Sequence, residues 1–288
     1  MKETPMAIIK TIPKPINVIV SIEFPTMKPF WVVLTFFLLL VASKKANSID
    51  LVEVVSFNFD PFSHGNPAIE LQGDATILTD GNVLLTDLSS PGSTGRVLYA
   101  PPVRLWDTAS GNVANFITSF SFQLTDYQDF TPADGIVFFI APENTQIPPG
   151  ATGGALGVAD PSGVGEFVGV EFDTYSNGEY RDPPHSHVGI DVNSVVSLRT
   201  VEWNRQSGSV VEVTVIYDSS SKTLSVAVKN RSGEIVTISE VVDLKEKLPE
   251  RVKFGFSSAG SLGGRQINLI RSWSFSSSLK TVTGVASA

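Results

Sequence analysis

The chain has 288 residues, a formal net charge of −8 and no cysteine. The absence of cysteine excludes a disulfide framework, a thiol nucleophile and a cysteine-ligated zinc site. Charged residues make up only 17% of the chain, so intrinsic disorder is not expected. The acidic balance and the lack of a basic run argue against binding to the phosphate backbone of nucleic acids.

The N-terminal region predicts a secretory signal peptide. An apolar run over residues 30–42 follows a basic flank, and the small residues Ala46 and Ser48 lie where cleavage would require them. The run is shorter than the roughly 20 residues that a membrane-spanning helix needs. We therefore expect residues 1–48 to be an extension and signal peptide, and residues 49–288 to form one domain that is extracellular or vacuolar, without a membrane span. Loss of residues 1–48 removes six basic and two acidic residues and leaves a net charge of −12.

Beyond the leader, the sequence predicts strands. Runs of β-branched and aromatic residues, several with apolar and polar residues alternating, are separated by turn residues. These runs lie at 115–124, 135–140, 166–174, 210–217, 222–229 and 252–257. Residues 218–221 predict a hairpin turn, and the only helix candidate, 243–248, is ended by Pro249. We predict an all-β fold, an antiparallel β-sandwich of two layers.

The segment 167–197 concentrates side chains that bind metal ions. Glu171 and Asp173 are two apart on a predicted strand, so both carboxylates point to one face. Asn177 and Asp182 follow in a loop, and His187 opens the next strand. Carboxylate and amide oxygens suit calcium, and carboxylates with one imidazole suit manganese. The alternative is a solvated acidic loop beside a satisfied core histidine, but the E-x-D pair and the histidine together favour a metal site.

This segment resembles the metal site of the legume lectins, whose pattern runs V-E-F-D-T-[FY]-x-N, a short loop with D-P, and then H-[IV]-G-I-D-V-N-S. Other stretches between residues 50 and 279 are similar to that family: 56–59, 95–99, 106–107, 111–116, 133–142, 255–257 and 272–275. The resemblance implies a jelly-roll, concanavalin A-like sandwich that binds carbohydrate without catalysis. It also implies a homodimer or homotetramer and a role in plant defence.

The resemblance further implies two metal ions. A Mn²⁺ site would take Glu171, Asp173, Asp182 and His187, with Ser197 holding a water ligand. A Ca²⁺ site would take Asp173, Asn177, Asp182 and the backbone carbonyl of Tyr175. Two features depart from the family pattern, because four residues separate Asn177 from Asp182 and one of them is Arg181.

The carbohydrate site implied by the resemblance lies beside the calcium. Asp134, which follows a cis peptide bond in the family, would accept hydrogen bonds from two sugar hydroxyls. Asn177 and the backbone N–H of Gly154 would donate, and the ring of Tyr175 would stack on the sugar. Leu262, Gly263 and Gly264 are specificity candidates in the loop 259–268, although a flexible hairpin end explains that loop as well. The sequence does not choose among mannose or glucose, galactose, fucose and complex glycans.

Three other functions remain open. A lectin-like storage or defence relative would have lost sugar binding, yet every expected position is occupied here. A glycoside hydrolase of the same sandwich fold would carry E-x-D-x-E, and the third acid is replaced by Tyr175. The ectodomain of a receptor kinase would require the chain to be a fragment. Asn230 begins the one N-glycosylation sequon and is expected to carry a glycan, and His64 and His185 are expected to be solvated.

Overall fold

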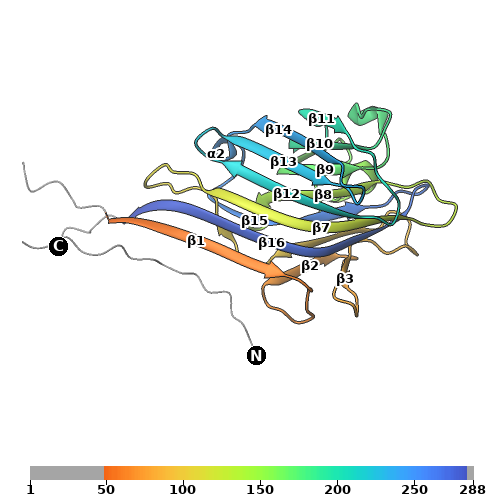
Figure 1. Ribbon diagram of the computed structural model, residues 1–288, viewed down its shortest axis with the longest axis horizontal. Helices are drawn as coiled ribbons and strands as arrows, with labels where there is room; N and C mark the ends of the chain where they lie inside the picture. Colours follow the sequence, from red (N-terminus) through yellow and green to blue (C-terminus); the bar gives the residue numbers. More distant parts are fainter. Residues whose placement is uncertain (1–48, 284–288) are drawn as a thin grey trace, which may run out of the picture.

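The computed structural model describes residues 49–283, which form two antiparallel sheets packed face to face (Figure 1). In the back sheet the strands, in spatial order, are β14 (Ile235–Val241), β13 (Thr223–Lys229), β12 (Val210–Asp218), β7 (Asn115–Asp126), β16 (Gln266–Thr283), β4 (Val83–Leu84) and β3 (Thr76–Ile77), and β1 (Ile49–Phe59) pairs with β16. In the front sheet they are β11 (Arg199–Glu202), β10 (His187–Ser194), β9 (Val164–Asp173), β8 (Gly135–Pro142), β15 (Arg251–Ala259), β5 (Thr94–Tyr99) and β2 (Ile69–Gly73), and β6 (Val103–Arg104) pairs with β15. This architecture confirms the predicted all-β sandwich.

The main hydrophobic core lies between the two sheets. In the back sheet, buried and more exposed residues alternate along β7, β12 and β13, because only one face of that sheet is covered. In the front sheet, most of β8 and β9 is buried without alternation. The reason is a second, smaller apolar cluster on its outer face, where residues of the loop 143–163 pack against strand residues such as Leu98 and Phe139.

The predicted elements correspond closely to the observed ones. The six predicted runs became β7, β8, β9, β12, β13 and β15, and the turn at 218–221 joins β12 to β13. The helix candidate is α2 (Leu244–Lys247), whose first turn is capped by the Asp243 side chain. The predicted signal peptide lies outside the described residues. Across the residues that are described, none of the helices has the length and apolar character needed to cross a membrane.

Candidate metal and carbohydrate site

The metal-site candidates meet where β9 ends and β10 begins. His187 is the register partner of Asp173 in this antiparallel pair, and Glu171 lies opposite Gly189. Glu171, Asp173 and His187 are all at most 3% exposed, and each offers a ligand atom within 4.8 Å of the other two. The strand pairing therefore brings these three predicted ligands together.

Further polar groups surround the Glu171 carboxylate. One of its oxygens lies 3.2 Å from His187 Nε2 and 2.6 Å from the Ser197 hydroxyl. The same hydroxyl lies 2.6 Å from the carboxylate of Asp191, which is completely buried. We did not identify Asp191 from the sequence, although it is four residues after His187 on one strand and alternation places both side chains on the same face.

The loop with the unusual spacing closes back on itself. Residues 178–180 form the short 3₁₀ turn η2 (Gly178–Tyr180), and the backbone N–H of Asn177 donates a 2.7 Å hydrogen bond to the Asp182 carboxylate. This bond keeps Asp182 next to Asn177 despite the extra residues. Arg181 is exposed and takes part in none of the ion pairs found among the described residues.

Asp134 directly precedes the neighbouring strand β8 and lies next to this cluster. The Ala133–Asp134 peptide bond is cis, as the family resemblance implied, and the carbonyl of Asp134 accepts a 3.0 Å hydrogen bond from Thr174 N–H. Gly154 lies in η1 (Gly153–Ala155), so close to Asn177 that a Cβ at position 154 would overlap the Asn177 amide oxygen. Asp134, Gly154 and Asn177 therefore border one small region.

A fourth residue of this region, Ser261, was missed by the sequence analysis. It lies in the loop between β15 and β16, where a Cβ at Gly153 would come within about 4 Å of both the Ser261 side chain and the Asp134 carboxylate. The bond from Gly153 N–H to the Gly260 carbonyl holds this loop in place. The predicted Leu262 and Gly263 follow directly, but both are exposed at the loop tip and no hydrogen bond ties them to Asp134. The ring of Tyr175 is also exposed.

The carboxyl groups of this cluster disfavour one another's ionisation. Burial raises the pKa of Asp134 to about 7, an effect that the nearby Ser261 hydroxyl opposes and the charge of Asp182 reinforces. Burial also raises the pKa of Asp182 to about 6. Burial, with the charges of Glu171 and Asp182, raises the pKa of Asp173 well above its ordinary value.

The pKa of His187 shifts in the direction opposite to the one that burial alone would cause. Burial alone would lower the pKa of His187, but the hydrogen bond to Glu171 and the charges of Glu171 and Asp182 raise it overall. The negative charge of the acids therefore favours the protonated, positively charged form of His187. The same negative charge would attract a divalent cation.

The donor set fits divalent cations. Asp134 Oδ2, Asn177 Oδ1 and Asp191 Oδ2 are buried without a hydrogen-bond partner, which is costly unless a further group compensates. Buried carboxylates with an amide oxygen suit calcium, and the addition of His187 suits a transition metal. The cluster has the composition expected for the predicted ion pair, and a positive charge there would offset the repulsion among its acids.

The sequon residue has a different environment. Asn230 is 5% exposed, and its amide oxygen accepts a 2.9 Å hydrogen bond from the indole N–H of Trp203. Its amide nitrogen donates to the carbonyl of Asn204 and to Glu234. A glycan would replace one hydrogen of that nitrogen, so this environment counts against the expected glycosylation. His64 and His185 are exposed, as predicted.

Two facing antiparallel sheets with an acid–histidine cluster where β9 meets β10 are the arrangement of a lectin-type β-sandwich. The legume lectin domain model matches residues 54–286, and the chain belongs to the legume lectin family. A galactose-binding lectin of Arachis hypogaea is 68% identical over 258 residues, which are 89% of this chain and 94% of that protein.

Solved structures agree with this assignment. Peanut lectin with a nine-residue peptide aligns with a TM-score of 0.79 and 69% identity over 80% of this chain and 99% of that one. Winged bean acidic lectin complexed with methyl-α-D-galactose aligns with a TM-score of 0.72 and 41% identity, over 80% of this chain and 100% of that chain. The family predicted from sequence motifs is thus confirmed.

Proposed function

We propose that this lectin binds galactose and galactose-terminated glycans, without cleaving them, at the region bordered by Asp134, Gly154 and Asn177. The observation that carries the proposal is the buried, unpartnered oxygen of Asp134 beside the donors of Gly154 and Asn177. The choice of galactose follows the 68% identical galactose-binding relative and the galactoside complex of the winged bean lectin.

Each residue has a distinct part in binding. Asp134 accepts hydrogen bonds from sugar hydroxyls, and the backbone N–H of Gly154 and the side-chain amide of Asn177 donate. The exposed ring of Tyr175 stacks on the apolar face of the sugar, and Leu262 and Gly263 contact the rim of the ligand. This division suits a sugar because alternating donors and acceptors discriminate the orientation of its hydroxyls.

We assign the two metal ions as Ca²⁺ and Mn²⁺. Asp173, Asn177, Asp182 and the Tyr175 carbonyl would hold calcium, and Glu171, Asp173, Asp182 and His187 would hold manganese, with Ser197 bound through water. When present, the ions supply the positive charge that keeps the buried carboxylates ionised. The chain itself holds Asp134 and Asn177 in place through the bonds described above.

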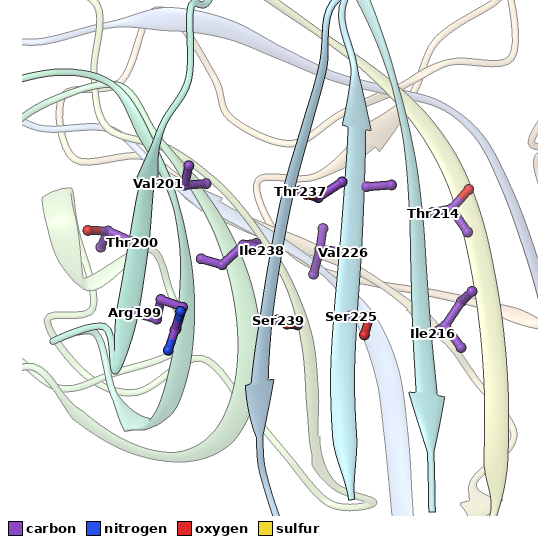
Figure 2. Close-up of a pocket in the computed structure, with 11 residues that line it drawn as sticks. Arg199, Thr200, Val201, Thr214, Ile216, Ser225, Val226, Thr237, Ile238 and Ser239 are labelled. Carbon is purple, nitrogen blue, oxygen red and sulfur yellow. The ribbon is translucent and has the colours of Figure 1, made fainter. Parts of the chain in front are cut away.

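A homodimer or homotetramer would compensate for weak binding at each shallow site through multivalency. The outer face of the back sheet is the surface we assign to subunit contact. A hollow of about 470 Å³ is lined by β12, β13 and β14 of this sheet together with β11 of the front sheet, and Thr214, Ile216 and Ser225 are among the residues that line it (Figure 2). Ile216→Lys should lower the mass measured by light scattering if this face is buried between subunits.

We also propose that the mature protein starts near Ile49 after removal of residues 1–48 in the secretory pathway, and that residues 49–288 are one carbohydrate-binding domain. N-terminal sequencing of protein secreted by plant cells tests the cleavage. A mature protein that retains residues 30–42 would contradict it.

Isothermal titration with galactose, mannose and fucose, in Ca²⁺ and Mn²⁺, tests the sugar assignment. We expect galactose to bind and Asp134→Asn to weaken it by about a hundredfold or more, because the variant loses a charged acceptor. Asp160→Asn is the matched control, since Asp160 is a half-buried loop residue whose side chain accepts hydrogen bonds only within its own turn. If no sugar binds the wild-type protein, the chain is a non-binding storage or defence relative instead.

A further inference from the structure

The loop that carries Gly154 is long and has little regular structure of its own. It connects β8 to β9 through residues 143–163, and η1 is the only helical turn within it. Ordering such a loop costs conformational entropy, so its position must be fixed by contacts with the rest of the protein. Its apolar side chains, such as Leu156, pack on the outer face of the front sheet.

Arg96 makes polar contacts to two separate points of this loop, at residues 145 and 157. It lies on β5 and is only 1% exposed. Its Nε donates a 2.9 Å hydrogen bond to the Gly157 carbonyl, to which Nη2 also donates, and Nη1 donates a 3.1 Å bond to the Thr145 hydroxyl. Nη1 also lies 3.5 Å from the side-chain oxygen of Gln72 on β2. One guanidinium therefore joins residues 145 and 157 to the sheet.

The cation is unusual because it is buried without a carboxylate partner among the described residues. Burial lowers the pKa of Arg96 to about 10, so the side chain stays charged at neutral pH. Its guanidinium carbon lies 4.9 Å from the centre of the Phe139 ring, which adds a cation–π contact. A buried charge is costly unless well hydrogen-bonded, and an apolar side chain would fill the same space at lower cost. Its hydrogen bonds to the loop are what an apolar side chain could not replace.

The neighbouring contacts leave the loop little freedom. Gly157 has φ +71°, and a Cβ there would overlap the side chains of Ser257 and Thr94. The Ser257 hydroxyl donates a 2.6 Å bond to the Leu156 carbonyl. The chain between the two Arg96 contacts includes Gly154, which lies against Asn177 in the proposed sugar region.

The geometry points to Arg96 as a positioning residue for sugar binding, which pins residues 145 and 157 so that Gly154 keeps its place against Asn177. It does not touch the sugar or the metal ligands. This inference rests on the proposed function, because Gly154 matters only if sugar binds beside it.

The test uses Arg96→Met, which keeps the length but removes the charge and donors, and Arg96→Lys, which keeps the charge without the fork. We expect Arg96→Met to weaken galactose binding about tenfold, and Arg96→Lys to have an affinity between those of Arg96→Met and the wild type. The calcium dissociation constant should change less than about twofold, because Asp173, Asn177 and Asp182 lie outside the loop. Amide hydrogens of residues 151–159 should exchange about tenfold faster while those of β9 do not.

Val226→Ala is the control for general destabilisation, because Val226 is buried in the back sheet on β13. It should lower the melting temperature and leave galactose affinity unchanged. Thr145→Val, which removes one partner of Arg96, gives a milder variant should Arg96→Met fail to fold. It should weaken galactose binding by less than the tenfold expected for Arg96→Met.

Wild-type galactose affinity in Arg96→Met, or an equal loss in Val226→Ala, would overturn the inference. If the wild-type protein binds no sugar, the proposed function fails, and amide exchange still reports whether Arg96 holds the loop. The two failures are therefore distinguishable.

Discussion

Asp134, Asp182 and His187 make the stability of the metal-free protein depend on pH. The pKa values of Asp134 and Asp182 are about 7 and about 6 in the folded chain, against about 3.9 for an unfolded aspartate. Between about pH 4 and pH 7 the folded state therefore binds more protons than the unfolded state, and the free energy of unfolding falls as the pH rises. The raised pKa of His187 acts in the same direction, since its stabilising contribution is lost as the pH rises through the folded value.

We expect the metal-free melting temperature to drop between about pH 5 and pH 7. Asp182→Asn should flatten this dependence, because one of the titrating groups is gone, whereas Asp160→Asn should not. Calorimetry of protein freed of metal by dialysis measures both. A melting temperature that rises over this interval would refute the titration argument.

Asn230 is expected to be unmodified in the folded protein. Replacing it with alanine would leave the buried indole N–H of Trp203 without its acceptor and cost roughly 1–3 kcal/mol. Ser232→Ala destroys the sequon without touching the amide, so its melting temperature should equal that of the wild type, and after secretion the two masses should differ only by the one oxygen atom that the substitution removes. Intact mass spectrometry decides the matter, and a glycan on Asn230 would contradict this prediction.

At the scale of elements, η1 and the loop with η2 depend on a glycine at position 154. Gly154→Ala would push its Cβ into the Asn177 amide oxygen, so we expect galactose to bind at least about tenfold more weakly. Gly178→Ala is the matched control, because a Cβ there meets no atom within 4 Å. Titration of both variants with galactose tests the proposal, which equal affinities would refute.

Strands were predictable where burial repeats along the sequence. Alternation in 115–124 and 210–217 reflects a sheet with one covered face, and the unbroken apolar run at 135–140 reflects a strand covered on both faces. The sequence analysis missed most of β16, because its serines resemble a loop. In the structure, Trp273, Phe275 and Leu279 point into the core, while Ser276 and Ser278 are exposed.

The site was predictable where its residues are close in the chain. Glu171, Asp173 and His187 belong to one β-hairpin, so spacing and alternation were enough to group them. Ser261 lies beside residue 134, and Arg96 bonds residue 157, but the two members of each pair are far apart in the sequence. No local pattern reports such contacts, because strand order and register decide them.

At the scale of the whole molecule, strand order follows long-range pairing that the sequence does not display. β16 pairs with β7 over most of its length and with both β1 and β4 on its other side, so β1 and β16 run side by side (Figure 1). These pairings join the beginning and end of the described chain in one sheet. Binding of metal ions at the cluster in the front sheet should therefore raise the melting temperature of the entire sandwich, because both sheets share one core.

Metal removal tests this coupling. A ligand present at about 100 times its dissociation constant stabilises the folded state by about 2.7 kcal/mol, which for a domain of this size corresponds to roughly 5–10 °C in melting temperature. We expect Ca²⁺ and Mn²⁺ to raise the melting temperature by about that amount at pH 7 and by less near pH 5, where protons compete for His187 and the carboxylates.

Calorimetry with and without chelator at both pH values makes the comparison, with galactose binding measured on the same samples. Asp182→Asn should show a smaller metal effect, since it loses a ligand of both proposed ions, while Asp160→Asn should behave as wild type. Identical melting with and without metal would mean that the cluster binds no ion, and the unpartnered oxygens of Asp134, Asn177 and Asp191 would then require protons or water instead.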